Sequence, residues 1–301
     1  MIYKAHIATF RAASNVSPNA AGTAVIQVKP GIGDVIWHLP FIRAIAAAAP
    51  GGKVVFLAPP SSRAQELLAA EPGVAETIYF RHTGSELARG VNLVRLALLL
   101  RRRQFRSIWI LDRTTRPAFA ATLAGIPERI GLGLGAQKVF LTNPGIDRSH
   151  FHDHPIDWLR ALMAAMEVPL PSTEPALRID DATLRAIAEK FAQAPRPWIV
   201  LGIGASHPDK DWPDENWAGF IPALRGRTTG TVFLIGGDAN LARAQKFIAA
   251  GGGATPINAC GLGLIEATAL LRHADLFVGP SSGPLNLAAA VGTESFGLFG
   301  S

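Results

Sequence analysis

The sequence predicts an α/β protein with two Rossmann-like domains whose parallel sheets face each other across a cleft. Short apolar segments alternate with helical segments along most of the chain. A proline-rich stretch at 168–175 interrupts this alternation, which then starts again. The 301 residues, of which 49% are hydrophobic, are enough for two domains that each bury a core.

The first predicted domain covers residues 1–168, and residues 1–22 form an extension without a clear strand or helix pattern. Its strands are expected at 23–28, 53–57, 76–80 and 107–112, which are rich in β-branched and aromatic residues. Helices are expected at 35–49, 61–71, 85–103, 116–124 and 155–167. Strands that alternate with helices pair in parallel, so a sheet covered on both faces follows.

A linker at 169–178 leads to the second predicted domain, residues 179–301. Its strands are expected at 198–202, 231–235, 275–278 and 294–299. Helices are expected at 215–224, 240–250 and 265–272, and a further one follows directly on residues 281–283. The two halves share an architecture and no visible sequence repeat.

Composition narrows the possible partners. The net charge of +6 favours a phosphorylated ligand, nucleic acid or an anionic membrane surface. The only dense basic cluster, Arg101–Arg103 with Arg106, closes a predicted helix, where cations also suit the helix dipole, and we expect no nucleic-acid partner. The single cysteine, Cys260, excludes an internal disulfide and is expected to be buried. No apolar run reaches the length of a membrane span, so we expect a cytoplasmic protein, with contact to the inner membrane face left open.

Three loops that follow predicted strands carry the candidate chemistry. In the last, Ser281 and Ser282 are suited to N-cap a helix, and Gly283 lets a ligand approach the backbone. A helix start of this kind suits an anionic group, above all phosphate. In the middle loop, Gly204 also permits close approach, Ser206 offers a hydroxyl and Lys210 a charge for a diphosphate.

The first loop, 28–34, contains Gly33 and Asp34 in a tight turn before a helix. Asp34 is either a helix-capping residue or a general base that takes a proton from an attacking hydroxyl. Both interpretations stay open from the residues alone. A dinucleotide fingerprint is not supported, because a third glycine and an acidic residue after the second strand are missing.

Other polar turns have weaker signals. Gly236 and Gly237 open a helix and are either a nucleotide contact or a plain turn. Asp112, Arg113 and Arg116 follow a strand and could meet an anionic acceptor, with a surface loop as the equal alternative. The segment 150–154 holds three histidines and an aspartate, but nothing else supports a metal site, and we expect none.

Taken together, the three loops resemble glycosyltransferase family 9, the heptosyltransferases of lipopolysaccharide assembly. The shared marks are Lys29-Pro-Gly-Ile-Gly-Asp-Val35, Gly204-Ala-Ser with Lys210-Asp-Trp-Pro213, and Gly279-Pro-Ser-Ser-Gly-Pro-Leu-Asn-Leu-Ala-Ala-Ala290. The resemblance covers the chain from about residue 23 onwards. It implies a GT-B fold, with the acceptor on the N-terminal domain and an ADP-sugar donor, here ADP-heptose, on the C-terminal one.

The resemblance also implies roles for single residues. Asp34 is the expected catalytic base of an inverting transfer that needs no metal or other cofactor, and the loop at Gly33 lies on the acceptor side. Lys210, Ser206 and the backbone at Ser282 and Gly283 are expected to contact the donor diphosphate, where charge builds on the leaving group. The acceptor implied is a lipid-linked or anionic glycan.

Three departures keep an alternative open. Ser281 stands where the family usually has Asp, and Asn286, also expected at the donor, stands where it usually has His. The family pattern continues beyond residue 301, so we expect a shortened C-terminal domain or a different closure. A non-catalytic nucleotide- or phosphosugar-binding protein is therefore the alternative, and an NAD-dependent dehydrogenase is disfavoured.

Overall fold

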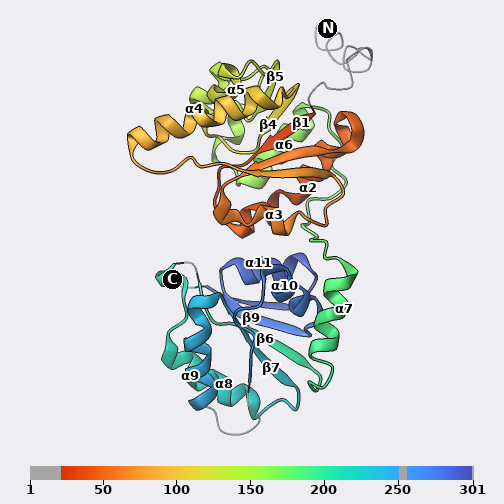
Figure 1. Cartoon of the computed structure of the whole chain (residues 1–301), viewed down its shortest axis with the longest axis vertical. Coiled ribbons are helices and arrows are strands. Elements are labelled where there is room, and N and C mark those ends of the chain that lie inside the picture. The colour runs from red at the N-terminus through yellow and green to blue at the C-terminus, as the bar shows by residue number, and fades with distance from the viewer. Residues whose placement is uncertain (1–21, 206, 251–255, 300–301) are drawn as a thin grey trace.

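The computed structural model describes residues 22–205, 207–250 and 256–299. Two parallel sheets, each of five strands, form two halves stacked along the long axis of the molecule (Figure 1). The predicted α/β architecture with two Rossmann-like units is therefore confirmed. None of the helices in the described ranges is long and apolar enough to cross a membrane.

The N-terminal sheet has the order β3-β2-β1-β4-β5, and every neighbouring pair is parallel. Its strands are β1 (Thr23–Ile26), β2 (Val54–Ala58), β3 (Val74–Tyr79), β4 (Ser107–Ile110) and β5 (Glu128–Gly131). One face packs on α2 (Ile32–Ala48), α3 (Ala64–Leu67) and α6 (Pro155–Ala165). The other face packs on α4 (Glu86–Arg103) and α5 (Thr115–Leu123).

The C-terminal sheet has the order β10-β9-β6-β7-β8 and is also entirely parallel. Its strands are β6 (Trp198–Gly202), β7 (Thr231–Ile235), β8 (Ile257–Asn258), β9 (Leu276–Pro280) and β10 (Ser295–Leu298). Helices α7 (Asp181–Lys190), α10 (Leu264–His273) and α11 (Gly283–Ala290) cover the face toward the other half. Helices α8 (Asp214–Arg225) and α9 (Leu241–Ala250) cover the outer face.

Both sheets repeat one topology. Counted from the first strand of each half, the order is 3-2-1-4-5 in both, so each sheet has a switch point between its first and fourth strands. Ligands of doubly wound folds bind at the carboxyl ends of the strands at this point. In the N-terminal half the switch point lies between β1 and β4, and in the C-terminal half it lies between β6 and β9.

The central strands are buried because their sequences are almost continuously apolar. Every residue of β1, β6 and β7 is buried, as expected for parallel strands that carry helices on both faces. Cys260 is buried as predicted, and burial raises the pKa of its thiol to about 11.

Some element predictions were wrong or incomplete. The helix expected at 61–71 is instead a 3₁₀ turn, Pro60–Ser62, and the single turn α3, separated by Arg63 in the left-handed region at φ 54°. A residue with positive φ cannot continue a right-handed helix. Strands β5 and β8 and helix α7 were not predicted, although Asp180 caps α7 by accepting a hydrogen bond from the Thr183 N–H.

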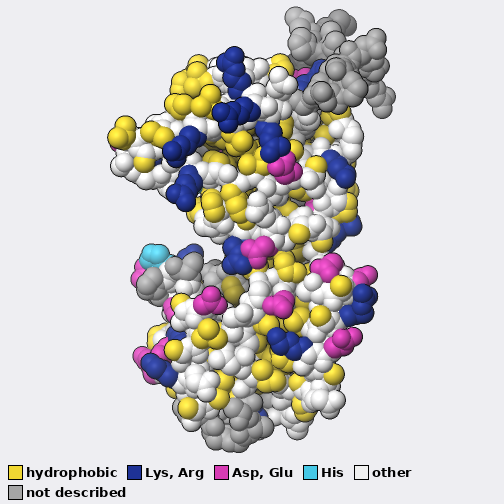
Figure 2. All heavy atoms as spheres, viewed as in Figure 1, with side chains coloured by type: hydrophobic (Ala, Val, Ile, Leu, Met, Phe, Trp, Pro, Cys, Tyr) yellow, Lys and Arg dark blue, Asp and Glu magenta, His cyan; other side chains and the backbone are white. Residues whose placement is uncertain are grey.

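The two halves meet through helices. In Figure 1, α2 and α3 at the base of the N-terminal half face α11 and α10 of the C-terminal half, and α2 contacts α11 while α3 contacts α10. The predicted linker, 169–178, lies between α6 and α7. It is held from both sides, because Arg43 Nη2 donates to the Ala176 carbonyl over 2.6 Å and the Leu177 N–H donates to the Ala290 carbonyl over 2.8 Å. Figure 2 shows the surface hollowed between the halves on the side where the β6–α8 loop lies.

Candidate active site

The switch point of the N-terminal sheet is built on a buried aspartate. Asp112 Oδ2 accepts the Val28 N–H over 3.1 Å, and Oδ1 accepts the Thr114 N–H over 2.8 Å and the Thr114 hydroxyl. Burial raises the pKa of Asp112, and these hydrogen bonds oppose that rise. Asp112 therefore ties the segments after β1 and β4 together, and its carboxylate is engaged with them.

The segment after β1 leads from Val28 to Asp34 at the first turn of α2. Asp34 is the third residue of the helix, where its Oδ2 accepts the Gly31 N–H over 3.1 Å. Its Oδ1 lies 3.8 Å from Lys29 Nζ, and about a third of its side chain is exposed. The carboxylate thus has a helix-capping contact and an open side, so the two sequence interpretations of Asp34 are compatible.

Two buried side chains, Gln27 and His38, form a hydrogen-bonded pair that holds the start of this segment. The His38 ring nitrogen Nδ1 pairs with Gln27 Oε1, and Gln27 Nε2 donates to the Lys29 carbonyl over 3.0 Å. Both side chains are buried. Burial, and then the charge of Lys29, lower the pKa of His38 to about 3, so the imidazole is neutral at physiological pH.

The loop of the first half lies directly against α11 of the second. A Cβ placed on Gly33 would lie 2.8 Å from Asn286 Nδ2, and one placed on Gly283 would lie 3.5 Å from Ile32 Cδ1. Trp37 Nε1 donates to Asn286 Oδ1 over 3.0 Å. The residue next to Asp34 and the residue predicted to bind the donor are therefore in contact.

The turn before α11 uses its serines differently from the prediction. Ser282 is the N-cap residue, but its side chain makes no capping hydrogen bond, and its hydroxyl instead donates to the Gly204 carbonyl over 3.4 Å. The Ser281 N–H continues the sheet by donating to the Leu298 carbonyl. The Gly283 and Leu285 N–H groups have no partner within the helix by geometry, and the Ser282 side chain does not cap them, so this first turn is suited to an anionic ligand.

Gly204 and Gly236 share one neighbour, Asn240. A Cβ on Gly204 would lie 2.6 Å from Asn240 Oδ1, and a Cβ on Gly236 would lie 2.7 Å from Asn240 Cβ. The space that was expected at Gly204 for a ligand is thus filled by the Asn240 side chain. Gly237 is different, since an added Cβ there would meet no atom of the described residues within 4 Å.

The β6–α8 loop is anchored by a residue that sequence reasoning missed. Arg243 on α9 donates to the Ile203 carbonyl, to Asp211 Oδ2, to Asp214 Oδ1 and to the Trp212 carbonyl, over 2.6 to 2.9 Å. Lys210, within this loop, is exposed. Ser206, predicted beside it, lies outside the described residues. The only sequence signal for Arg243 was its place on a predicted helix.

These contacts connect four of the predicted donor-side residues, Asn286, Ser282, Gly204 and Gly236, in one row. Gly33 touches Asn286, Asn286 Nδ2 donates to the Ser282 carbonyl over 3.0 Å, and Ser282 reaches Gly204. Gly204 and Gly236 then meet at Asn240. The row joins the turn beside Asp34 to the switch point of the C-terminal sheet. This arrangement is compatible with a base on one side and an anionic ligand on the other.

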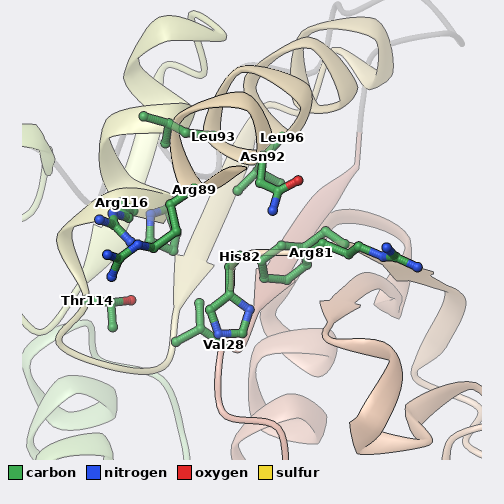
Figure 3. Close-up of a pocket in the computed structure, with 11 residues that line it drawn as sticks. Val28, Arg81, His82, Arg89, Asn92, Leu93, Leu96, Thr114 and Arg116 are labelled. Atoms are coloured by element: carbon green, nitrogen blue, oxygen red, sulfur yellow. The ribbon is translucent and has the colours of Figure 1, made fainter. Parts of the chain in front are cut away.

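A second part of the site is a cavity of about 110 Å³ in the N-terminal half (Figure 3). It lies beyond the carboxyl ends of β1, β3 and β4, and α4 and α5 cover it. Arg89 and Arg116 lie side by side next to Thr114, His82 lies across from them near Val28, and Arg81 points away. The lining residues are Val28, Phe80, Arg81, His82, Arg89, Asn92, Leu93, Leu96, Thr114, Arg116 and Pro117.

Two features of this cavity favour an anionic group. Glu86 is the carboxylate that pairs with both Arg89 and Arg116, so two cations share one acid. Among the residues that the structure describes, His82 Nδ1 and Arg89 Nε are buried without a hydrogen-bond partner. Burial lowers the pKa of His82, Asp112 raises it and Arg116 lowers it. Of the residues that line this cavity, only Arg116 was a predicted site residue, because the lining comes from four segments: those after β1 and β3, helix α4, and the start of α5.

Other predicted residues lie outside both parts. The Arg113 guanidinium stacks over Trp158, at 5.3 Å from the ring centroid, and over Phe151. His150 pairs with Asp153, and His154 accepts the Ile156 N–H at the start of α6. Within the described part of the chain, no three His, Cys, Asp or Glu side chains are grouped to hold a metal ion.

Two Rossmann-like domains with facing switch points are the GT-B architecture, the class of fold found in solved heptosyltransferases. Residues 93–301, more than half of the chain, match glycosyltransferase family 9 (heptosyltransferase). The chain belongs to this family, and the protein is a glycosyltransferase.

Individual relatives agree with this assignment. The chain is 24% identical over 276 residues to the lipopolysaccharide core heptosyltransferase OpsX of Haemophilus influenzae, which covers 89% of this chain and 76% of OpsX. It superimposes on the ADP-heptose LPS heptosyltransferase II of E. coli with a TM-score of 0.71 at 22% identity, over 92% of this chain and 84% of that one. A family 9 glycosyltransferase of Veillonella parvula gives a TM-score of 0.74 at 20% identity, over 94% and 82%.

Proposed function

We propose that this glycosyltransferase transfers heptose from ADP-heptose to a hydroxyl of a lipid-linked, anionic glycan acceptor of the lipopolysaccharide core. The donor and acceptor classes follow those in the names of its relatives, a lipopolysaccharide core heptosyltransferase and an ADP-heptose LPS heptosyltransferase. The contact of Gly33 with Asn286 carries the proposal, because it brings the turn with Asp34 against the predicted donor turn.

Asp34 is the proposed general base. Its open carboxylate oxygen takes the proton of the acceptor hydroxyl as that oxygen attacks the sugar carbon, and the diphosphate leaves from the opposite face, which inverts the configuration. Lys29 Nζ lies 3.8 Å from Asp34 Oδ1, on the same segment after β1. The base belongs to the N-terminal half and the leaving group to the C-terminal half.

The leaving diphosphate is proposed to be met by Lys210 and by the first-turn N–H groups of α11. These groups supply positive charge where negative charge develops, which is the task a metal ion has in other transferases. No metal or other cofactor enters the proposed chemistry. The cytoplasmic location predicted from the sequence suits a nucleotide-sugar donor and stays a prediction.

The cavity between α4, α5 and β3 is proposed to hold an anionic group of the acceptor. Arg89, Arg116 and His82 present donors there, and arginine is the side chain best suited to carboxylate and phosphate. The segment 28–34 links this cavity, through Val28, to Asp34. An acceptor bound by its anionic group is thus held on the same segment that carries the base.

The variant Asp34→Asn tests the proposed base. Asparagine keeps an oxygen that accepts the Gly31 N–H, so the helix start is preserved, but it cannot take a proton. Turnover with ADP-heptose is expected to fall by roughly 10²- to 10⁴-fold, while ADP binding by calorimetry stays within about two-fold of the unaltered protein. Asp181→Asn, at an exposed position on α7, is the matched control and keeps full turnover.

Two outcomes would count against this function. Undiminished turnover in Asp34→Asn removes the proposed base. ADP binding without transfer from any ADP-sugar in the unaltered protein favours the alternative, a non-catalytic nucleotide-binding protein, for which Ser281 and Asn286 are the relevant departures from the family pattern.

A further inference from the structure

Helix α4 exposes a stripe of large apolar side chains to solvent. Leu87, Val91, Val94 and Leu98 are 80%, 43%, 54% and 50% exposed. Their spacing of four, three and four residues puts all of them on one face of the helix, within about 60° of one another. Scattered exposed leucines need no explanation, but four aligned along about 16 Å of one helix do.

The opposite face of the same helix packs against the core and lines the cavity. Leu96, Ala97 and Leu100 are buried in the core under the sheet. Arg89, Asn92, Leu93 and Leu96 line the cavity proposed for the acceptor. The apolar stripe therefore adds nothing to the fold, and α4 separates the cavity from whatever contacts the stripe.

The charges around the stripe have one sign. Arg95, Arg101 and Arg102 are exposed and flank it on the helix, and no acid lies between them in the sequence of α4. The single acid of the helix, Glu86, is in the first turn and pairs with Arg89 and Arg116. Figure 2 shows hydrophobic and basic side chains together along this edge of the N-terminal half.

We propose that the outer face of α4 lies in the interface of an anionic lipid bilayer. An apolar stripe bordered by arginines is the pattern of helices that rest on a membrane with their apolar side chains among the acyl chains and their cations at the headgroups. A second copy of this chain fits less well. A stable protein interface takes roughly 20–30 residues on each side, and two such faces would bring the same arginines together.

With α4 on the bilayer, the cavity behind it would lie close to the membrane surface. This part of the inference rests on the proposed lipid-linked acceptor. The helix that would lie on the bilayer is the one that covers the cavity. An acceptor anchored by its acyl chains would therefore present its anionic glycan beside Arg89 and Arg116 without leaving the membrane. Binding to lipid itself can be measured without any acceptor.

Vesicle co-sedimentation of the full chain tests the proposal. The unaltered protein is expected to bind vesicles that contain about one third phosphatidylglycerol and to bind pure phosphatidylcholine at least about 10-fold more weakly. Raising the salt from about 0.05 to about 0.5 M should release much of the bound protein. Arg95→Gln with Arg102→Gln should weaken binding by roughly 30-fold, and Leu87→Ser with Val94→Ser by about 10-fold or more.

Matched controls separate the stripe from general charge and hydrophobicity. Arg185→Gln with Arg227→Gln removes the same charge from exposed positions of the C-terminal half, and Leu241→Ser with Phe296→Ser removes exposed apolar side chains there. Both controls should bind as the unaltered protein does. All four double variants alter exposed side chains, so circular dichroism should show them folded.

Three outcomes overturn the proposal: equal binding to neutral and anionic vesicles, stripe variants that bind as the unaltered protein does, or a dimer in light scattering that the stripe variants abolish. Its failure is separable from that of the proposed function. Asp34→Asn should lose transfer and keep vesicle binding, whereas the stripe variants should lose vesicle binding and keep transfer to a deacylated, water-soluble acceptor.

Discussion

At the scale of single residues, the neutrality of His38 connects the stability of the N-terminal half to pH. The folded protein holds the pKa of His38 at about 3, while an unfolded histidine titrates near 6.5. Below about pH 6.5 the unfolded chain therefore binds a proton that the folded chain excludes. This contribution to stability is complete above pH 6.5 and is lost as the pH falls toward 3.

The variant His38→Asn should remove that pH dependence. Asparagine keeps an N–H group that can donate to Gln27, and it does not titrate. Between pH 7 and pH 5 the free energy of unfolding of the unaltered protein should fall by about 2 kcal/mol more than that of the variant, measured by urea denaturation. His152→Asn, at an exposed position, should change nothing.

An equal loss in His38→Asn and in the unaltered protein would contradict this account. A second measurement does not depend on the variant, because the His38 ring in the unaltered protein should stay neutral at pH 5 by NMR. The sequence could place His38 on the first helix, but it could not show that the side chain is buried against Gln27. That contact depends on how α2 packs over β1.

At the scale of elements, the strands predicted most accurately from the sequence are those buried on both faces of their sheet. The strands now seen as β1, β6 and β7 are continuous apolar runs, and each was expected within about two residues of its observed ends. The strands that were missed, β5 and β8, are short and lie at the edges of their sheets, where pairing with one neighbour defines the strand. Glu128-Arg129-Ile130-Gly131 in β5 has no pattern that distinguishes it from a loop.

The glycines that end β6 and β7 were predicted as places for ligand approach, and at two of them the structure gives a packing reason instead. Gly236→Ala would put a Cβ 2.7 Å from Asn240 Cβ, and Asn240 is itself confined by Gly204. We expect this overpacking to lower the free energy of unfolding by about 1–3 kcal/mol. Gly237→Ala is the control next to it, where the added Cβ meets nothing and the change should stay within about 0.5 kcal/mol.

Chemical denaturation of both variants checks this prediction. Equal stabilities for the two would show that Asn240 moves aside without cost. Because Asn240 also contacts Gly204, ADP binding should weaken in Gly236→Ala and not in Gly237→Ala. Weaker ADP binding in Gly236→Ala alone would show that the packing at the end of β7 affects the loop at Gly204, which is proposed to contact the donor.

At the scale of the whole molecule, what the sequence could supply was a list of motifs, and what it could not supply was their contacts. Asp34, Gly33, Ser282 and Asn286 were recognisable because each lies in a strand–turn–helix segment of family type. Trp37, Asn240 and Arg243 were not, since each matters through a partner in another segment. Trp37 and Asn286 are separated by 249 positions, and a single sequence contains no signal that pairs them.

The Trp37–Asn286 hydrogen bond is the contact through which we expect the halves to influence each other. It fixes the Asn286 amide so that Oδ1 faces α2 and Nδ2 faces the Ser282 carbonyl. Trp37→Phe keeps an aromatic ring and removes the indole N–H, so the variant loses this one hydrogen bond to Asn286. Since Asn286 lies at the proposed donor site, ADP binding should weaken by roughly 2- to 10-fold, with little change in the free energy of unfolding because Trp37 is 41% exposed.

Calorimetric titration with ADP measures this effect, and Trp158→Phe is its matched control. Trp158 Nε1 also donates a hydrogen bond, to the His150 carbonyl over 2.6 Å, but within the N-terminal half. That variant should therefore bind ADP as the unaltered protein does. If Trp37→Phe also bound ADP unchanged, the amide of Asn286 would be oriented by its own helix alone, and this residue of the N-terminal half would have no part in shaping the proposed donor site.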